Sequence, residues 1–200
     1  MGKAFFEVFP SLELEKKVYD IIEQCQVEKV SSTKKKDFLR VYIKSSRLIM
    51  KEDIRYTEQA IKSQLFPKAP IVVKLYEKFE LSSQYTPENL MEVYYESMLS
   101  EIQEYSNILY NILKNAEFSF PLENRIVINL EDTVIARSKE DELTDILQKI
   151  LVERCGFSLE IYVEYREVET GKFALEDELK LKQEVAQIYN RVMRLKEAEQ

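Results

Sequence analysis

The sequence predicts an α+β protein made of two small sheet-and-helix modules followed by a helical tail. Three observations predict this fold: short runs with alternating apolar residues, longer segments with one apolar face, and a polar link that divides them into two sets. The alternation is clearest in residues 37–45, where Leu39, Val41 and Ile43 point one way and the residues between them the other. Each set has the order α-β-β-α-β.

The polar link between the two sets spans residues 81–90. A β-type run ends at Phe79, just before it. Inside the link, Thr86 suits a helix N-cap and Pro87 the first helical position, where its missing N–H costs nothing. The link is therefore the expected domain boundary. The predicted divisions are residues 1–80 and 81–168 for the domains and 169–200 for the tail.

The first set begins with a helix that Ser11 is expected to cap and that runs to about Cys25. The other elements expected in this set are strands 27–31 and 37–45, a helix at 52–66 and a strand at 71–79. The crossover between the last two strands contains a helix, which predicts that they are parallel. Both helices should then cover one face of a three-stranded sheet.

The second set begins with a long apolar pattern over residues 86–112, which fits one helix or two stacked helices, the second capped near Ser106. Ser138 and Asp141 suggest a capping box for the next helix. Gly156 is expected to take a left-handed conformation after that helix. The strands expected in this set are 117–120, 125–130 and 158–165.

The tail differs from both sets because apolar residues recur in it at 4-3-4-3 spacing among charged ones. These residues are Leu181, Val185, Ile188, Val192 and Leu195. The spacing fits a solvated linker helix, and it also fits a helix that pairs with another helix.

Charge is distributed unevenly along the chain. Residues 1–79 hold 16 Lys and Arg against 11 Asp and Glu, whereas residues 80–200 hold 13 against 25. The two halves are therefore expected to face different surroundings. No apolar run approaches the ~20 residues of a membrane span, and the start of the chain lacks a signal-peptide pattern, so the expected location is the cytoplasm.

The residues that usually carry catalysis or bind metals are scarce. The chain has no histidine, only two cysteines (Cys25 and Cys155) and three glycines, which removes most metal sites and any glycine-rich phosphate loop. Both cysteines are expected to be buried free thiols. The acidic groups at 131–132 and 140–142 are explained by predicted helix starts. We expect no catalytic, metal-binding or cofactor-binding residue in these 200 residues.

A cluster of basic residues on the hairpin of the first set is the best candidate for a binding site. Its core residues are Lys34, Lys35, Lys36, Arg40, Tyr42 and Lys44, within a wider run from Lys29 to Lys51. Alternation places Arg40, Tyr42 and Lys44 on the sheet face away from the helices. A solvated surface, an acidic protein partner and weak single-stranded DNA contact all fit this composition.

Several stretches resemble the N-terminal region of the PolC-type DNA polymerase III family, the replicative polymerase of low-GC Gram-positive bacteria, in its clostridial form. The resemblance spans about residues 5–166. The stretches that carry it are Phe5-Phe6-Glu7-Val8-Phe9-Pro10, Phe38 to Ser45, Glu58 to Lys62, Gln64-Leu65-Phe66-Pro67, Gln84 to Tyr94, Leu130 to Val134 and Glu153-Arg154-Cys155-Gly156.

The resemblance implies two non-catalytic domains, the first similar to truncated type II KH-like folds that serve as protein–protein modules. The parent enzyme would be a DNA-directed DNA polymerase with a 3′–5′ exonuclease, whose catalytic acids lie outside these residues. The implied partners are replisome proteins, such as clamp-loader or other polymerase-associated subunits. KH nucleic-acid binding needs a Gly-x-x-Gly clamp, which this sequence lacks.

Three functions fit the sequence. The first is a non-catalytic adaptor region of a PolC-type replicase that mediates protein–protein contacts in the replisome. The second is a nucleic-acid-binding accessory module that uses the basic residues 29–51. The third is a free-standing scaffold protein, which would require a reading frame that stops near Gln200.

Overall fold

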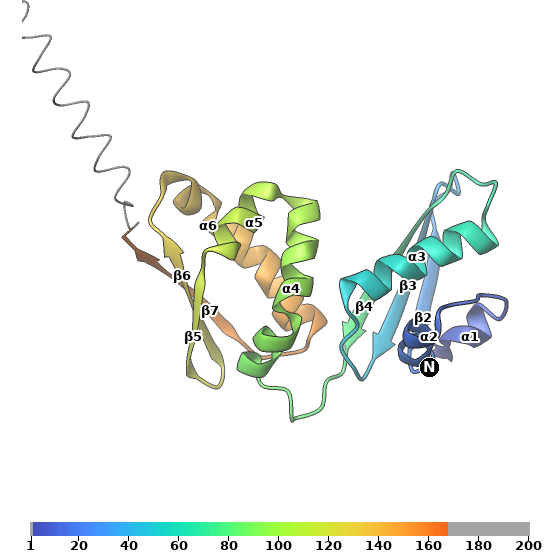
Figure 1. Ribbon diagram of the computed structural model, residues 1–200, viewed down its shortest axis with the longest axis horizontal. Coiled ribbons are helices and arrows are strands. Elements are labelled where there is room, and N and C mark those ends of the chain that lie inside the picture. The colour runs from blue at the N-terminus through green and yellow to red at the C-terminus, as the bar shows by residue number, and fades with distance from the viewer. Residues whose placement is uncertain (1, 168–200) are drawn as a thin grey trace, which may run out of the picture. The chain divides into compact units, whose positions relative to one another are not determined.

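The computed structural model describes residues 2–167, and the residues up to Arg166 form one compact unit. Its architecture is α+β, with two small sheets that helices cover (Figure 1). The division of this unit into domains at residue 80 stays a prediction. The helical tail expected at 169–200 lies outside the described residues.

The first sheet contains β1 (Lys3–Ala4), β2 (Gln26–Ser32), β3 (Phe38–Ser45) and β4 (Val72–Phe79), in that order. β2 and β3 are antiparallel, whereas β3 and β4 are parallel. The parallel pair expected from the helical crossover is therefore confirmed. The sheet has one strand more than expected, because Lys3 and Ala4 pair with Val27 and Gln26 at its edge.

Three helices belong to the first sheet: α1 (Phe5–Val8), α2 (Lys16–Ile22) and α3 (Lys51–Leu65). α3 runs across the strands of this sheet (Figure 1). Buried Ile54 and Ile61 of α3 and Val18 of α2 share one hydrophobic core with Val41 of β3. One face of the sheet is thus packed against helices.

The helix expected from Ser11 to Cys25 is wrong at its start, because α2 begins only at Lys16. The backbone ahead of it is held by α3. Glu13 N donates to Gln64 Oε1 over 2.8 Å, and Gln64 Nε2 donates to Glu13 O over 2.7 Å. Because a side chain satisfies these groups, the segment needs no helical hydrogen bonds of its own.

The second sheet contains β5 (Glu117–Leu122), β6 (Arg125–Glu131) and β7 (Glu160–Arg166), in that order. β5 and β6 are antiparallel, and β6 and β7 are parallel. This is the pairing pattern of β2, β3 and β4. The expected second α-β-β-α-β order is therefore present, with its first helix divided in two.

That division occurs at Ser106. α4 (Pro87–Tyr105) starts with the predicted cap, in which Thr86 Oγ1 accepts from Asn89 N and the Asn89 side chain accepts from Thr86 N. α5 (Asn107–Lys114) starts at Ser106, whose hydroxyl accepts from Leu109 N. The second of the two alternatives, two stacked helices, is the correct one.

The capping box expected at Ser138 is wrong. α6 (Val134–Leu147) begins earlier, and Thr133 Oγ1 accepts a hydrogen bond from Ala136 N over 3.0 Å. Ser138 lies inside the helix, where its hydroxyl donates to Ile135 O. Both residues can cap a helix, and Thr133 holds the position because β6 ends at Glu131, two residues before it.

α6 continues into a π-helical segment, η1 (Gln148–Arg154), which ends at Cys155. Gly156 follows with φ +79°, the left-handed conformation that was expected there. Its N–H donates to Val152 O, and the next N–H, that of Phe157, donates to Leu151 O. Cys155 and Cys25 are buried free thiols, as predicted.

The free edge of the first sheet at β4 is partly occupied by a side chain. Leu75 N donates to Glu58 Oε1 over 2.8 Å, and Lys74 Nζ lies 3.1 Å from Glu58 Oε2. Glu58 is buried, so this carboxylate is held between α3 and the edge strand.

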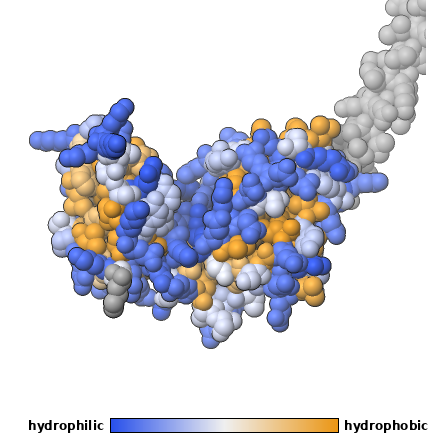
Figure 2. All heavy atoms as spheres, turned by 180° about the vertical axis from the view of Figure 1, so that it is seen from behind, coloured by the Kyte–Doolittle hydropathy of each residue, from blue (hydrophilic) through white to orange (hydrophobic). Residues whose placement is uncertain are grey.

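The surface of the described residues mixes hydrophobic and hydrophilic side chains, as Figure 2 shows for the side opposite to that of Figure 1. Within residues 2–167, none of the helices combines the length and the apolar character that crossing a membrane requires.

Candidate functional site

The open face of the first sheet collects basic and aromatic side chains from two strands. In β3, the apolar residues Leu39, Val41 and Ile43 are buried. Residues directly opposite in neighbouring strands share a face. The register therefore adds residues of β4 to the face predicted from the sequence, in the pairs Arg40 with Lys74, Tyr42 with Tyr76, and Lys44 with Lys78.

The two tyrosines form the centre of this face. The rings of Tyr42 and Tyr76 are stacked, with centroids 5.1 Å apart and an angle of 20° between the rings. Lys29 Nζ, from β2, lies 5.7 Å from the centroid of the Tyr42 ring. The Arg40 guanidinium lies 5.2 Å from the Phe38 ring. Cations and aromatic rings thus lie next to one another on three adjacent strands.

The cations on this face differ in how far they are neutralised. Lys44 pairs with Glu80 over 2.5 Å, and the hydrogen bond with this carboxylate raises the Lys44 pKa. Lys74 pairs with Glu58. In the part of the chain that the structure describes, neither Lys29 nor Arg40 has an ion-pair partner within 4.0 Å. Within the same residues, exposed Lys78 of β4 forms no ion pair either, so Lys29, Arg40 and Lys78 are the charges of this face most available to a ligand.

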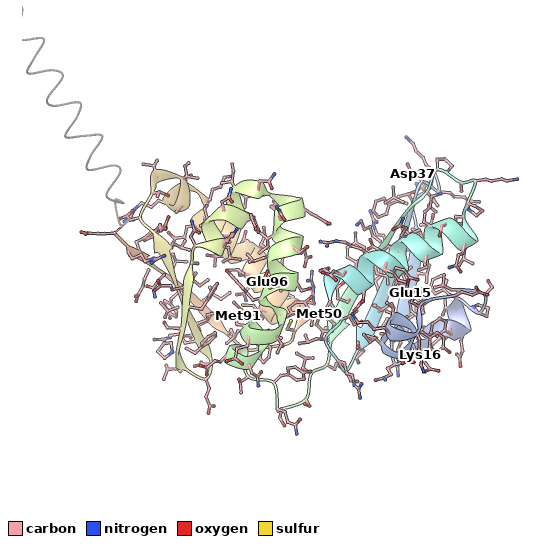
Figure 3. The ribbon with its side chains drawn as sticks, in the orientation of Figure 1. Glu15, Lys16, Asp37, Met50, Met91 and Glu96 are labelled. Carbon is pink, nitrogen blue, oxygen red and sulfur yellow. The ribbon has the colours of Figure 1, made fainter. Side chains whose placement is uncertain are left out.

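The three consecutive lysines lie in the turn between β2 and β3, not on the face itself. Lys34, Lys35 and Lys36 are exposed, and Lys36 has a positive φ of 55°. Asp37, at the tip of the hairpin (Figure 3), accepts a hydrogen bond from the Thr33 hydroxyl, which closes the turn. The structure thus brings together Arg40, Tyr42 and Lys44, while the turn lysines extend from the end of the same strands.

Sequence reasoning missed Lys74, Tyr76 and Lys78 as part of this surface. The signal was present, because Lys74, Tyr76 and Lys78 alternate with the buried residues Val73, Leu75, Glu77 and Phe79, much as Arg40, Tyr42 and Lys44 alternate with buried residues in β3. Only the parallel pairing of β3 with β4 shows that the two outward sets lie side by side.

A second group of charges is buried between α3, β4, α4 and η1. Lys51 Nζ lies 2.5 Å from Glu77 Oε1 and 3.3 Å from Glu101 Oε1. Arg154 makes two hydrogen bonds to Glu101, of 2.6 and 2.7 Å, and its Nη1 lies 3.3 Å from Glu77. The Glu77 side chain is only 1% exposed. We call Lys51, Glu77, Glu101 and Arg154 the ion cluster.

Burial and the charges of the ion cluster shift the pKa values of several groups. Burial acts to raise the pKa of Glu101, but the hydrogen bonds and charge of Arg154 outweigh it, so the pKa is lowered. Burial, together with the charge of Glu77, raises the pKa of Tyr94. Burial also raises the pKa of Cys155 to about 12 and that of Cys25 to about 11. These shifts stabilise charged Glu101 and leave both thiols protonated at neutral pH.

The acidic groups of the described region are dispersed or paired with cations. Within residues 2–167, no group of three or more Cys, Asp or Glu side chains is arranged to hold a metal ion. Asp132 makes two hydrogen bonds to Arg137, and Glu142 pairs with Lys139. What the described geometry offers a ligand is therefore a surface of cations and rings.

Comparison with known proteins finds a match for part of the chain. No curated protein matches it. A family model does match, and it runs from Ala4 at the end of β1, through α1, α2, β2, β3 and α3, to Leu75 within β4. The resemblance expected for the first set of elements is thereby confirmed, and its extension to residue 166 stays a prediction. Residues 4–75 match the family described as DNA polymerase III polC-type N-terminus I.

Proposed function

We propose that this chain is the non-catalytic N-terminal adaptor region of a PolC-type replicative DNA polymerase III and that it mediates protein–protein contacts in the replisome. The family match over residues 4–75 is the observation that carries this proposal. The catalytic parent, a DNA-directed DNA polymerase, and a cytoplasmic location are parts of the same proposal.

The repeated topology supports an adaptor. Each sheet has an antiparallel pair followed by a parallel strand after a helical crossover, and each is covered by helices. This order is compatible with the truncated type II KH-like folds of the implied family, which we include in the proposal. A repeated small module that lacks reactive groups in its described part is suited to present surfaces to partners.

An apolar surface on α5 and α6 is the part we assign to a protein partner. Ile108 is 49% exposed, and the first two residues of α6, Val134 and Ile135, are 86% and 58% exposed. Ile108 and Ile135 line a surface pocket of about 270 Å³ together with Ile112 and Ala136. Neighbouring exposed apolar residues of this kind mark protein interaction sites more often than single ones do.

The proposal is tested by affinity capture with the tagged chain from a lysate of a low-GC Gram-positive bacterium, followed by identification of the captured proteins. Clamp-loader or other polymerase-associated subunits should be recovered. Replacing Val134 and Ile135 together by Ser should reduce their recovery at least about tenfold, because two exposed apolar contacts of ~1 kcal/mol each would be lost.

Val93 provides the matched control, because it is 52% exposed on α4 and lies outside the α5–α6 surface. Val93→Ser should leave recovery unchanged. Recovery of no replisome subunit by the unsubstituted chain would contradict the adaptor function. Equal loss with Val93→Ser would contradict the assignment of the surface.

A further inference from the structure

We propose that the open face of the first sheet binds single-stranded DNA, with Tyr76 stacking against a base, Tyr42 supporting the Tyr76 ring from behind, and Lys29 and Arg40 contacting phosphates. This proposal goes beyond the adaptor function, since it concerns a different surface and a different class of ligand. Its test does not depend on which protein the α5–α6 surface binds.

The arrangement of the rings is the first part of the case. Tyr76 is 43% exposed although it sits at the middle of a strand, and its ring stacks on that of Tyr42. Because β2 and β4 flank β3 on opposite sides, Lys29 and Tyr76 approach the Tyr42 ring from opposite sides. The far side of the Tyr76 ring then faces the edge of the sheet, where a base can extend the stack.

The distribution of charge is the second part. Arg40 and Lys29 come from neighbouring strands and flank the tyrosines, and the turn lysines continue the positive surface beyond the strand ends. Glu58 and Glu80 are paired with Lys74 and Lys44, whereas Glu28 of β2 lines a pocket together with Tyr42 and Tyr76. A polyanion that follows β3 therefore meets Arg40 and Lys29, which form no ion pair within residues 2–167.

An exposed aromatic ring beside unpaired cations favours one class of anionic ligand over the others. An acidic peptide would use the cations but gain little from the exposed ring of Tyr76. Duplex DNA offers phosphates but keeps the faces of its bases stacked on one another. A single strand can use both features, because its bases are free to stack on aromatic side chains while its backbone follows a basic surface. We commit to DNA over RNA because residues 4–75 match a DNA polymerase family.

The test measures fluorescence anisotropy of a labelled 20-nucleotide oligo(dT) titrated with the full chain. The expected Kd lies in the range of about 10⁻⁴ to 10⁻⁶ M at physiological salt, as for binding without sequence preference. Tyr76→Leu should weaken binding roughly 5- to 150-fold, the loss that removing one base–aromatic stack produces. Leu keeps an apolar side chain that a strand accepts.

Tyr162 is the matched control for this variant. It is 46% exposed on β7 of the second sheet, and the guanidinium of Arg125 lies 4.5 Å from its ring. Tyr162→Leu therefore removes a comparable exposed ring beside a cation and should leave the affinity for oligo(dT) unchanged. Circular dichroism of both variants checks that each sheet is intact.

The salt dependence tests the phosphate contacts. With two contacts, log K against log salt concentration should have a slope of about −1.4, and Lys29→Gln should reduce its magnitude by about 0.7. Lys114→Gln is the control, because Lys114 also lies over a tyrosine ring, that of Tyr110 at 5.6 Å, but on α5. It should leave the slope unchanged.

Four results would overturn the proposal. They are no binding of oligo(dT) at 50 mM salt, equal weakening by Tyr76→Leu and Tyr162→Leu, displacement of the oligonucleotide by polyglutamate at equal charge concentration, and tighter binding of duplex DNA or of an RNA oligonucleotide. The third would assign the face to an acidic protein instead. Loss of DNA binding with intact capture of replisome subunits would leave the adaptor function standing.

Discussion

Replacing Glu77 by Gln should destabilise the protein by about 3 kcal/mol, because it removes a buried charge that two cations share. The Glu77 side chain is 1% exposed, Lys51 Nζ lies 2.5 Å from its Oε1 and Arg154 Nη1 lies 3.3 Å from the same atom. Within residues 2–167, this oxygen has no hydrogen bond of good geometry, so charge attraction holds it. Gln keeps the volume of the side chain and removes only the charge.

The magnitude follows from what remains after the substitution. Removing one partner of a buried ion pair costs about 3–5 kcal/mol, because the other charge is left buried without compensation. Here Glu101 stays bound to Arg154 and stays 3.3 Å from Lys51, which places the cost at the lower end of that range. For a chain of this length, about 3 kcal/mol corresponds to a fall in Tm of roughly 6–12 °C.

Urea unfolding at pH 7, followed by circular dichroism, measures the change in unfolding free energy. Glu96→Gln is the control, because Glu96 is an exposed carboxylate on α4 (Figure 3), and this variant should unfold like the unsubstituted chain. Adding Lys51→Met to Glu77→Gln should recover part of the loss, since it removes a cation that has lost its closest partner. A change of less than about 0.5 kcal/mol for Glu77→Gln would refute the reasoning, because it is the change expected for an exposed residue.

Three further predictions concern the two buried cysteines, the turn at Gly156 and the Glu101 carboxylate. Burial raises the pKa of the Cys25 thiol to about 11 and that of the Cys155 thiol to about 12. Both thiols should therefore resist an aromatic disulfide reagent at pH 8 until urea unfolds the chain. Fast labelling of the native protein would contradict their burial. Gly156→Ala should lower the unfolding free energy by about 1–2 kcal/mol in urea titrations, because φ is +79° there, and an unchanged midpoint would show that the turn adapts. Folding lowers the pKa of Glu101, so the stabilisation by its charge is present above the unfolded-state pKa and is lost as pH falls through the folded-state pKa. Glu101→Gln should therefore flatten the decline of the unfolding free energy below about pH 4.5. A decline parallel to that of the unsubstituted chain would contradict the pKa shift.

The strands were the part of the fold most accessible from the sequence. β3 alternates without interruption from Leu39 to Lys44, so its buried face and its exposed face could be predicted, and the helical crossover after it predicted its parallel partner. Helix starts were harder, because several residues near each start can cap a helix. Thr133 and Ser138 both carry a suitable hydroxyl, and the residue at which β6 ends determines which of them caps α6.

The start of α2 illustrates a different limit. The apolar spacing from Leu14 to Cys25 fits a helix throughout, yet the backbone at Glu13 is bonded to the side chain of Gln64, 51 residues later. Such a contact can only be known once α3 is in place. Local pattern therefore predicts the helix but not its first turn.

The same distinction applies to the site. Arg40, Tyr42 and Lys44 could be assigned to one exposed face because alternation within a single strand decides it. The stack of Tyr42 on Tyr76 depends on register between strands that lie more than 30 residues apart in sequence. The ion cluster likewise consists of residues from four elements, and their spacing in the sequence does not predict that they meet. These residues are Lys51, Glu77, Glu101 and Arg154.

Glu58 gives the edge of the first sheet a property that matters at high protein concentration. By accepting the hydrogen bond of the Leu75 N–H, its carboxylate occupies a position that a strand of another molecule would need for pairing. An incoming strand would have to displace a buried, charged side chain and expose Lys74 without its counterion. Glu58 of α3 thus disfavours self-association of the chain into extended sheets.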